Sequence, residues 1–183
     1  MEKRIFGLTG LMACGKGTVA KYLVEKYDAE SFRFSTIVRD VLDRLYLPQS
    51  RENFQKIVPI LLDGFGTDLL SKIMAQDVMK SDKNIIVIDG IRRFPDIEHL
   101  KKIPGFKLVA IEVEAKTRYQ RLVARGENAG DAEKTWEQFL EEHKAATEID
   151  IPKLMASADI KIDNNGSVED LYKQLDGLIH PVK

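Results

Sequence analysis

Residues 4–18 read RIFGLTGLMACGKGT, and this stretch decides the fold. The apolar run at residues 5–8 predicts a buried strand, and a helical pattern begins at about Gly15. Between them lies the spacing Gly10-x4-Gly15-Lys16, which is typical of a phosphate-binding loop. Glycines let such a loop turn successive N–H groups toward phosphate oxygens, and the dipole of the following helix favours an anion there. The alternative is a glycine-rich turn with a surface lysine, but strand, loop and helix stand in the order that phosphate binding requires.

The residue after the lysine departs from the strict pattern. Gly17 occupies the position where Ser or Thr usually holds magnesium, and the hydroxyl follows one residue later at Thr18. This Gly-Lys-Gly-Thr form resembles the adenylate kinase branch of the nucleoside monophosphate kinases. The resemblance implies ATP bound with Mg²⁺ and a phosphoryl group passed to a small acceptor. It implies an ATP-binding set of Gly10, Ala13, Cys14, Gly15, Lys16, Gly17 and Thr18. Direct ligation of magnesium by Thr18 stays open.

Length and composition indicate one α/β domain. The chain has 183 residues, of which 44% are apolar and 31% charged, and its net charge is −1. This balance indicates neither a nucleic-acid nor a membrane partner. Cys14 is the only cysteine, which excludes an internal disulfide and fits a reducing cytosol, so we expect a cytoplasmic protein. For Cys14 itself, redox control and a small residue chosen for fit both remain open.

Alternation of strand and helix patterns predicts a doubly wound α/β fold around a parallel sheet. The predicted strands are residues 5–8, 29–34, 84–88, 107–113 and 158–162, the last at an edge of the sheet. A helical excursion at about 36–80 has the length and position of an acceptor-binding region, or is plain helical core. Pro59 should kink or restart a helix within it, and residues 63–66 should break it. Ser35 or Thr36 should cap the first helix of this region, and a charged helix is predicted over 132–147.

Asp89 follows the apolar run at residues 84–88, at the edge where parallel sheets bind ligands. Its carboxylate could serve magnesium through water, accept a proton, or merely cap a turn. Residues 89–93, DGIRR, resemble the Asp-Gly-Phe-Pro-Arg segment of adenylate kinases. The resemblance implies magnesium binding by Asp89 and acceptor-phosphate binding by Arg93, while Arg92 stands at the family's proline position with an open role.

A second arginine is implied on the acceptor side. Residues 35–39, STIVR, resemble a family segment two residues longer whose final arginine contacts the monophosphate. The resemblance therefore implies acceptor binding by Arg39, and a solvated helix face is its alternative.

Three arginines share one helical face before a loop of small breakers. Arg118, Arg121 and Arg125 are spaced i, i+3 and i+7. Phosphoryl transfer needs cations around the migrating group, and a guanidinium is always charged and grips two oxygens. The pair Arg121 and Arg125, with the loop at 126–131, resembles the short lid of compact family members, which implies a lid region at about 118–135. A salt-bridged surface helix is the alternative.

The segment ADIKIDNNGS at residues 158–167 resembles a stretch of dephospho-CoA kinases and of archaeal proteins related to adenylate kinase. The resemblance implies that Asn164, and more weakly Asn165, contacts the adenine of ATP. As a turn the same residues need no function. The three histidines, His99, His143 and His180, show no metal-ligand spacing.

Together these patterns predict a P-loop phosphotransferase whose acceptor is a nucleoside or deoxynucleoside monophosphate. Lys16, Asp89, Arg121 and Arg125 form its predicted catalytic set. Two alternatives stay open. One is a dephospho-CoA kinase-like enzyme with a hydroxyl acceptor and Asp89 as general base. The other is an ATP-operated switch that assembles a complex and hydrolyses ATP slowly.

Overall fold

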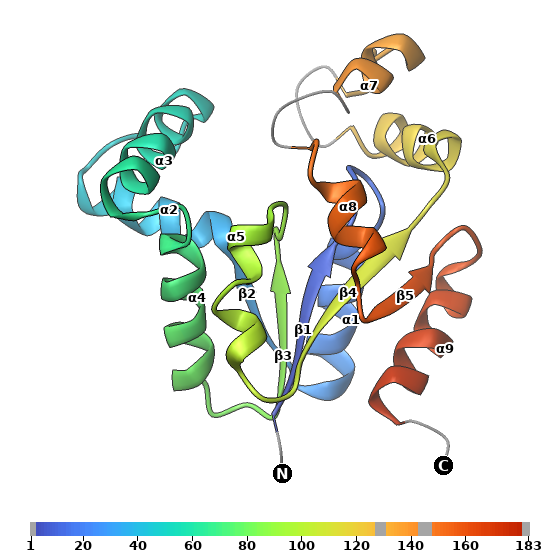
Figure 1. Ribbon diagram of the computed structural model, residues 1–183. Coiled ribbons are helices and arrows are strands. Elements are labelled where there is room, and N and C mark those ends of the chain that lie inside the picture. The colour runs from blue at the N-terminus through green and yellow to red at the C-terminus, as the bar shows by residue number, and fades with distance from the viewer. Residues whose placement is uncertain (1–2, 127–130, 143–147, 181–183) are drawn as a thin grey trace.

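A five-stranded parallel sheet forms the centre of the molecule (Figure 1). The computed structural model describes residues 3–126, 131–142 and 148–180. The strands stand in the order β2-β3-β1-β4-β5, and each pairs in parallel with its neighbours. Their bounds are β1 Arg4–Thr9, β2 Glu30–Arg33, β3 Ile85–Asp89, β4 Phe106–Glu112 and β5 Ile160–Asp163. The predicted fold class and the edge position of the last strand are confirmed.

Helices cover both faces of this sheet (Figure 1). One face carries α2, α4, α5, the 3₁₀ helix η1 and α8, and the other carries α1 and α9. Figure 1 shows α3 and α7 standing on opposite sides, beyond the carboxyl edge of the sheet. The bounds are α1 Lys16–Tyr27, α2 Phe34–Arg44, α3 Arg51–Phe65, α4 Leu69–Lys80, α5 Phe94–Ile97, η1 Leu100–Lys102, α6 Ala115–Arg125, α7 Trp136–Glu142, α8 Ile151–Ala156 and α9 Val168–Ile179.

The central strands supply both hydrophobic layers. In β3, Ile86 and Ile88 pack with the α2 and α4 layer, whereas Val87 packs with the α1 and α9 layer. All three side chains are fully buried. A strand covered on both faces needs apolar side chains at every position, which explains the continuous apolar run in the sequence.

The parallel register brings the candidate site to one edge. Arg33 of β2 pairs with Asp89 of β3, and Gly7 of β1 pairs with Ile88. The loop after β1 and the loop after β3 therefore leave the sheet side by side. The buried Thr9 hydroxyl joins them by donating to the Ile91 carbonyl at 3.2 Å.

The predicted helix over 132–147 is too long. The structure begins α7 at Trp136, because Thr135 Oγ1 accepts from the Gln138 N–H while Gln138 Oε1 accepts from the Thr135 N–H. This reciprocal pair is a capping box that starts the helix. Residues 143–147, which include His143, lie outside the described residues.

Three other helix predictions differ from the structure. α8 was not predicted; its Pro152 lies in the first turn of the helix, where no N–H is needed. α3 runs from Arg51 through Pro59 to Phe65, so the helix does not restart at the proline. α2 begins at Phe34 without a side-chain cap among the described residues, so the cap at Ser35 or Thr36 is wrong.

No described helix combines the length and apolar content needed to span a bilayer.

Candidate functional site

The loop between β1 and α1 is held tightly against its surroundings. A Cβ on Gly10 would lie 2.6 Å from Cys14 Sγ and 2.9 Å from the Ile111 carbonyl oxygen. Gly15 has a φ of 100°, and a Cβ there would overlap the Asn164 amide. Ala13 also has a positive φ, of 60°. Only glycine fits at the two glycine positions, so the motif spacing is a steric requirement of this loop.

The amino terminus of α1 follows this loop directly, at Gly15. Among the described residues, no side chain caps α1 at Gly15, and its first turn carries no acidic residue. The first N–H groups of a helix have no partner within the helix, and the dipole is positive there. An uncapped helix start behind a glycine loop is a ready anion-binding site.

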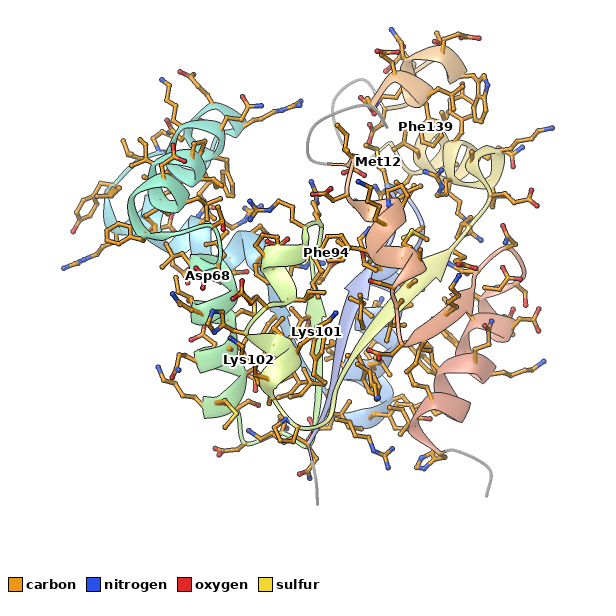
Figure 2. All side chains as sticks on the ribbon, in the orientation of Figure 1. Met12, Asp68, Phe94, Lys101, Lys102 and Phe139 are labelled. Carbon is orange, nitrogen blue, oxygen red and sulfur yellow. The ribbon has the colours of Figure 1, made fainter. Side chains whose placement is uncertain are left out.

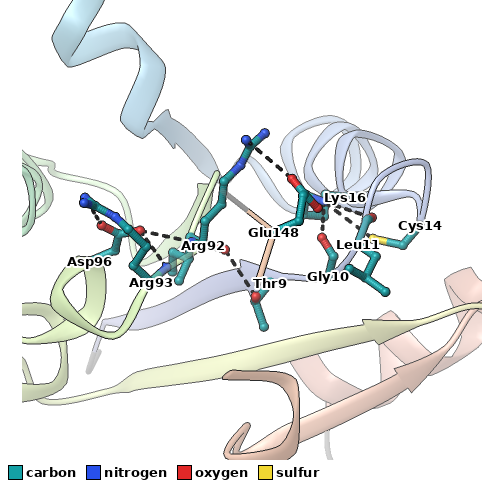
Figure 3. Close-up of polar contacts among 10 residues, drawn as sticks. Thr9, Gly10, Leu11, Cys14, Lys16, Arg92, Arg93, Asp96 and Glu148 are labelled. Atoms are coloured by element: carbon teal, nitrogen blue, oxygen red, sulfur yellow. Dashed lines mark hydrogen bonds and ion pairs between the residues drawn. The ribbon is translucent and has the colours of Figure 1, made fainter. Parts of the chain in front are cut away.

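Lys16 lies across this loop (Figure 3). Its Nζ donates to the carbonyl oxygen of Gly10 at 2.6 Å and to that of Leu11 at 3.4 Å, and lies 3.6 Å from Cys14 Sγ. Carbonyl oxygens hold an ammonium less strongly than phosphate oxygens do, because a phosphate carries a full negative charge and a carbonyl is only a dipole. The side chain is therefore placed to exchange these contacts for a phosphate.

Asn164 supports the loop from the end of β5. Its side chain is buried, and Nδ2 donates to the Cys14 carbonyl at 2.9 Å. The neighbouring Asn165 lies outside the loop and accepts from the Glu114 N–H at 2.8 Å. The structure thus gives Asn164 a contact with the loop backbone at the position where the resemblance implies a contact with adenine.

Asp89 presents an unpaired oxygen at the end of β3. Oδ2 lies 3.5 Å from Arg33 Nε, whereas Oδ1 is buried without a hydrogen-bond partner among the described residues. Mg²⁺ prefers hard oxygen ligands and usually takes one or two carboxylates together with phosphates. The Asp89 carboxylate fits such an ion, and Thr18 is an exposed residue in the first turn of α1.

The two arginines after β3 have different partners (Figure 3). Arg93 Nη2 donates to Asp96 Oδ1 at 2.8 Å. Arg92 Nη1 lies 3.6 Å from Oε1 of Glu148, a buried residue from the segment before α8.

Arg39 links α2 to the segment that leads into α3. Its Nη1 donates to Gln49 Oε1 at 2.8 Å, and the guanidinium lies 5.5 Å from the centre of the Phe54 ring. The residue is exposed. No described contact joins it to the phosphate loop.

Arg118 ties α6 to the phosphate loop. It is 4% exposed, and it donates to the Met12 carbonyl at 3.3 Å and to the Val113 carbonyl at 3.2 Å. Its guanidinium also lies 5.4 Å from the Phe139 ring of α7. Burial lowers the pKa of this guanidinium, while Cys14 and Glu148 act in the opposite direction. Figure 2 shows Met12 and Phe139 in the same part of the molecule.

Arg121 and Arg125 stand on the same helix and are less buried than Arg118. Arg121 is half-buried and Arg125 exposed, so the three arginines do not share one environment. Residues 127–130 of the predicted lid loop lie outside the described residues. The described part that follows is fixed to α6, because the Tyr119 hydroxyl donates to the Lys134 carbonyl at 2.9 Å.

Sequence reasoning missed two sets of polar residues. Glu148 carries no motif and became apparent only through its burial. His99 Nε2 lies 2.7 Å from Asp68 Oδ2, and hydrogen bonds from His99 and Lys72 lower the pKa of Asp68 to about 2. This second set lies on the other side of the molecule from Met12 (Figure 2).

The AAA domain family matches residues 7–147 of the chain. The chain belongs to this family. The matched range of this AAA domain includes the phosphate loop, Asp89 and the α6 arginines.

Curated relatives of this AAA domain protein come from archaea and have similar lengths. The UPF0200 protein MJ1399 of Methanocaldococcus jannaschii is 27% identical over 180 residues, which cover 97% of this chain and 90% of the relative. A UPF0200 protein of Sulfurisphaera tokodaii is 28% identical over 181 residues, covering 96% of each chain.

Solved structures share the fold. TT1252 from Thermus thermophilus superposes with a TM-score of 0.63 at 16% identity, over all of both chains. The shikimate kinase of Bacteroides thetaiotaomicron gives a TM-score of 0.63 at 17% identity, over 96% of both chains. This AAA domain therefore has the P-loop kinase fold that the sequence predicted.

Proposed function

We propose that the protein is an ATP-dependent phosphotransferase whose acceptor is a small phosphorylated molecule, a nucleoside or deoxynucleoside monophosphate. One observation carries the proposal: the uncapped start of α1, Lys16 and the unpaired Asp89 oxygen all lie at the same edge of the parallel sheet. An anion site beside a carboxylate with a spare oxygen suits a nucleotide phosphate that brings a magnesium ion.

In this mechanism the protein works by holding and neutralising charge. The loop N–H groups and Lys16 bind the outer phosphates of ATP, and Thr18 and Asp89 would hold Mg²⁺. When bound, the ion neutralises charge on the phosphate oxygens. Arg121 and Arg125 contact the migrating group and keep water from it.

In this proposal, residues around α2 and α3 form part of the acceptor-binding side. By resemblance, Arg39 and an arginine of the segment after β3 hold the acceptor phosphate. Arg39 already bonds Gln49 and lies over Phe54, which orients its guanidinium from two sides.

A hydroxyl acceptor, as in dephospho-CoA kinases, is the second candidate. The buried Oδ1 of Asp89 supports it, because an unpaired carboxylate oxygen is able to accept the proton of an attacking hydroxyl.

The test is ATP consumption by the purified full chain against nucleoside and deoxynucleoside monophosphates, dephospho-CoA, and no acceptor. Stimulation by a monophosphate supports the first proposal, and stimulation by dephospho-CoA supports the second. ATP binding with only slow, acceptor-independent hydrolysis contradicts both and favours the assembly switch.

Two lysine variants calibrate this assay. Lys16→Ala should lower turnover by several orders of magnitude, because it removes the charge that neutralises the phosphates. Lys21→Ala is the matched control, since Lys21 is exposed on α1 and pairs with Glu25, at 3.7 Å. Equal turnover in the two variants would contradict the phosphate-loop assignment.

A further inference from the structure

Arg92 and Arg93 are neighbours in the chain, but only the Arg93 side chain takes part in the cap of α5. The Arg93 guanidinium bonds Asp96 Oδ1 at 2.8 Å. Asp96 is 4% exposed, and its Oδ2 accepts from the backbone N–H groups of Arg92 at 3.0 Å and Arg93 at 2.9 Å. This reciprocal arrangement caps α5. Arg93 therefore neutralises a buried carboxylate that the turn requires.

The Arg92 side chain makes no described contact with this cap. Its side chain is 52% exposed, and its one partner among the described residues is Glu148 Oε1, at 3.6 Å. That distance permits charge attraction but is too long for a hydrogen bond. In Figure 3 the two arginine side chains diverge, Arg93 toward Asp96 and Arg92 toward Glu148. A guanidinium has five N–H donors, so those of Arg92 stay available.

Glu148 is in an unfavourable position for a purely structural residue. Its side chain is 8% exposed, and Oε2 is buried without a hydrogen-bond partner among the described residues. A buried carboxylate oxygen that lacks a partner is destabilising. The same carboxylate also acts on the charge of Arg118, which bonds the phosphate loop at Met12. Glu148 therefore lies beside the phosphate site. A negative charge there would repel a bound phosphate unless it is paired with a cation.

We infer that Arg92 contacts the acceptor phosphate and that Glu148 is the residue that positions it; this inference rests on the proposed function. Glu148 attracts one edge of the guanidinium, which leaves the other donors for a phosphate. Arg93 caps α5 instead of binding the acceptor. The site would then select an acceptor that carries a phosphate group within reach of the loop after β3.

The test compares two probes on the full chain. Diadenosine pentaphosphate extends from the donor side to the acceptor side, and a non-hydrolysable ATP analogue occupies the donor side alone. Arg92→Ala should weaken the pentaphosphate about 30-fold, the scale of a lost charge-assisted contact. It should change affinity for the ATP analogue less than about twofold. Arg93→Ala is the matched control: it should lower the unfolding temperature and leave the pentaphosphate affinity within about twofold.

Glu148→Gln separates positioning from structure. It should weaken the pentaphosphate about fivefold while the unfolding temperature stays constant or rises, because it removes a buried charge that lacks a full set of partners. Added to Arg92→Ala, it should have almost no further effect on binding, since it acts through that side chain. A lower unfolding temperature with unchanged binding would make Glu148 structural and overturn its assignment.

The remaining outcomes are distinct. A larger loss with Arg93→Ala than with Arg92→Ala, or no loss with Arg92→Ala, overturns the inference. Wild-type protein that binds the ATP analogue but not the pentaphosphate overturns it as well. Wild-type protein that binds neither probe contradicts the proposed function itself.

Discussion

Gly15→Ala should destabilise the protein through the phosphate loop. The residue has a φ of 100°, and a Cβ would overlap Asn164, whose amide donates to the Cys14 carbonyl at 2.9 Å. A left-handed conformation costs an L-residue about 1–2 kcal/mol. Displacing Asn164 forfeits a buried hydrogen bond worth about 0.5–1.5 kcal/mol. We expect a loss of about 2–3 kcal/mol, or about 4–12 °C in unfolding temperature for a chain of this size.

Gly17→Ala is the control for this substitution, measured by thermal unfolding followed by circular dichroism. Gly17 lies in the first turn of α1, and no atom would lie within 4 Å of an added Cβ. Alanine favours a helix over glycine, so this variant should keep or slightly raise the unfolding temperature. If Gly15→Ala unfolded within about 1 °C of the wild type, or Gly17→Ala lost as much, the steric reasoning would be refuted.

Three further substitutions test other parts of the molecule. Arg125→Ala should depress turnover more than ATP affinity, because its contact is strongest with the charge in transfer; equal losses in kcat and ATP binding would contradict this. Hydrogen bonds from Lys26, Tyr22 and Tyr27 lower the pKa of Asp176, so its stabilising contribution is present above about pH 4 and lost as the pH falls further. The gap in unfolding temperature between wild type and Asp176→Asn should therefore narrow as the pH falls below about 4, and a constant gap would show that the contacts are not electrostatic. Arg118→Ala should lower the unfolding temperature by about 4–12 °C, since it removes two buried hydrogen bonds, while Lys116→Ala, an exposed change in α6, should lower it little.

Local sequence patterns were sufficient to predict those elements that interactions between neighbouring residues determine. The apolar run of β3 predicted a strand buried on both faces, because only such a strand needs apolar side chains at successive positions. Ser167 precedes the helical pattern directly and caps α9, because its Oγ accepts from the Asp170 N–H at 3.1 Å. Local reading failed at Pro59, where the helix continues through the proline instead of restarting.

Glycine spacing and hydrophobic period act over a few neighbouring residues, so the phosphate loop and the parallel sheet could be predicted from the amino-acid sequence. The partners of the polar side chains became known only from the folded structure. Arg92 and Arg93 are neighbouring residues of the same type, but they have different partners in the folded protein. Arg93 bonds Asp96 in the cap of α5, whereas Arg92 lies beside Glu148. Asn164 reaches the Cys14 carbonyl in the same way, across the sheet. The contacts of Arg92 and Asn164 join segments distant in the chain, and the burial that makes an unpaired carboxylate costly exists only once those segments have packed together.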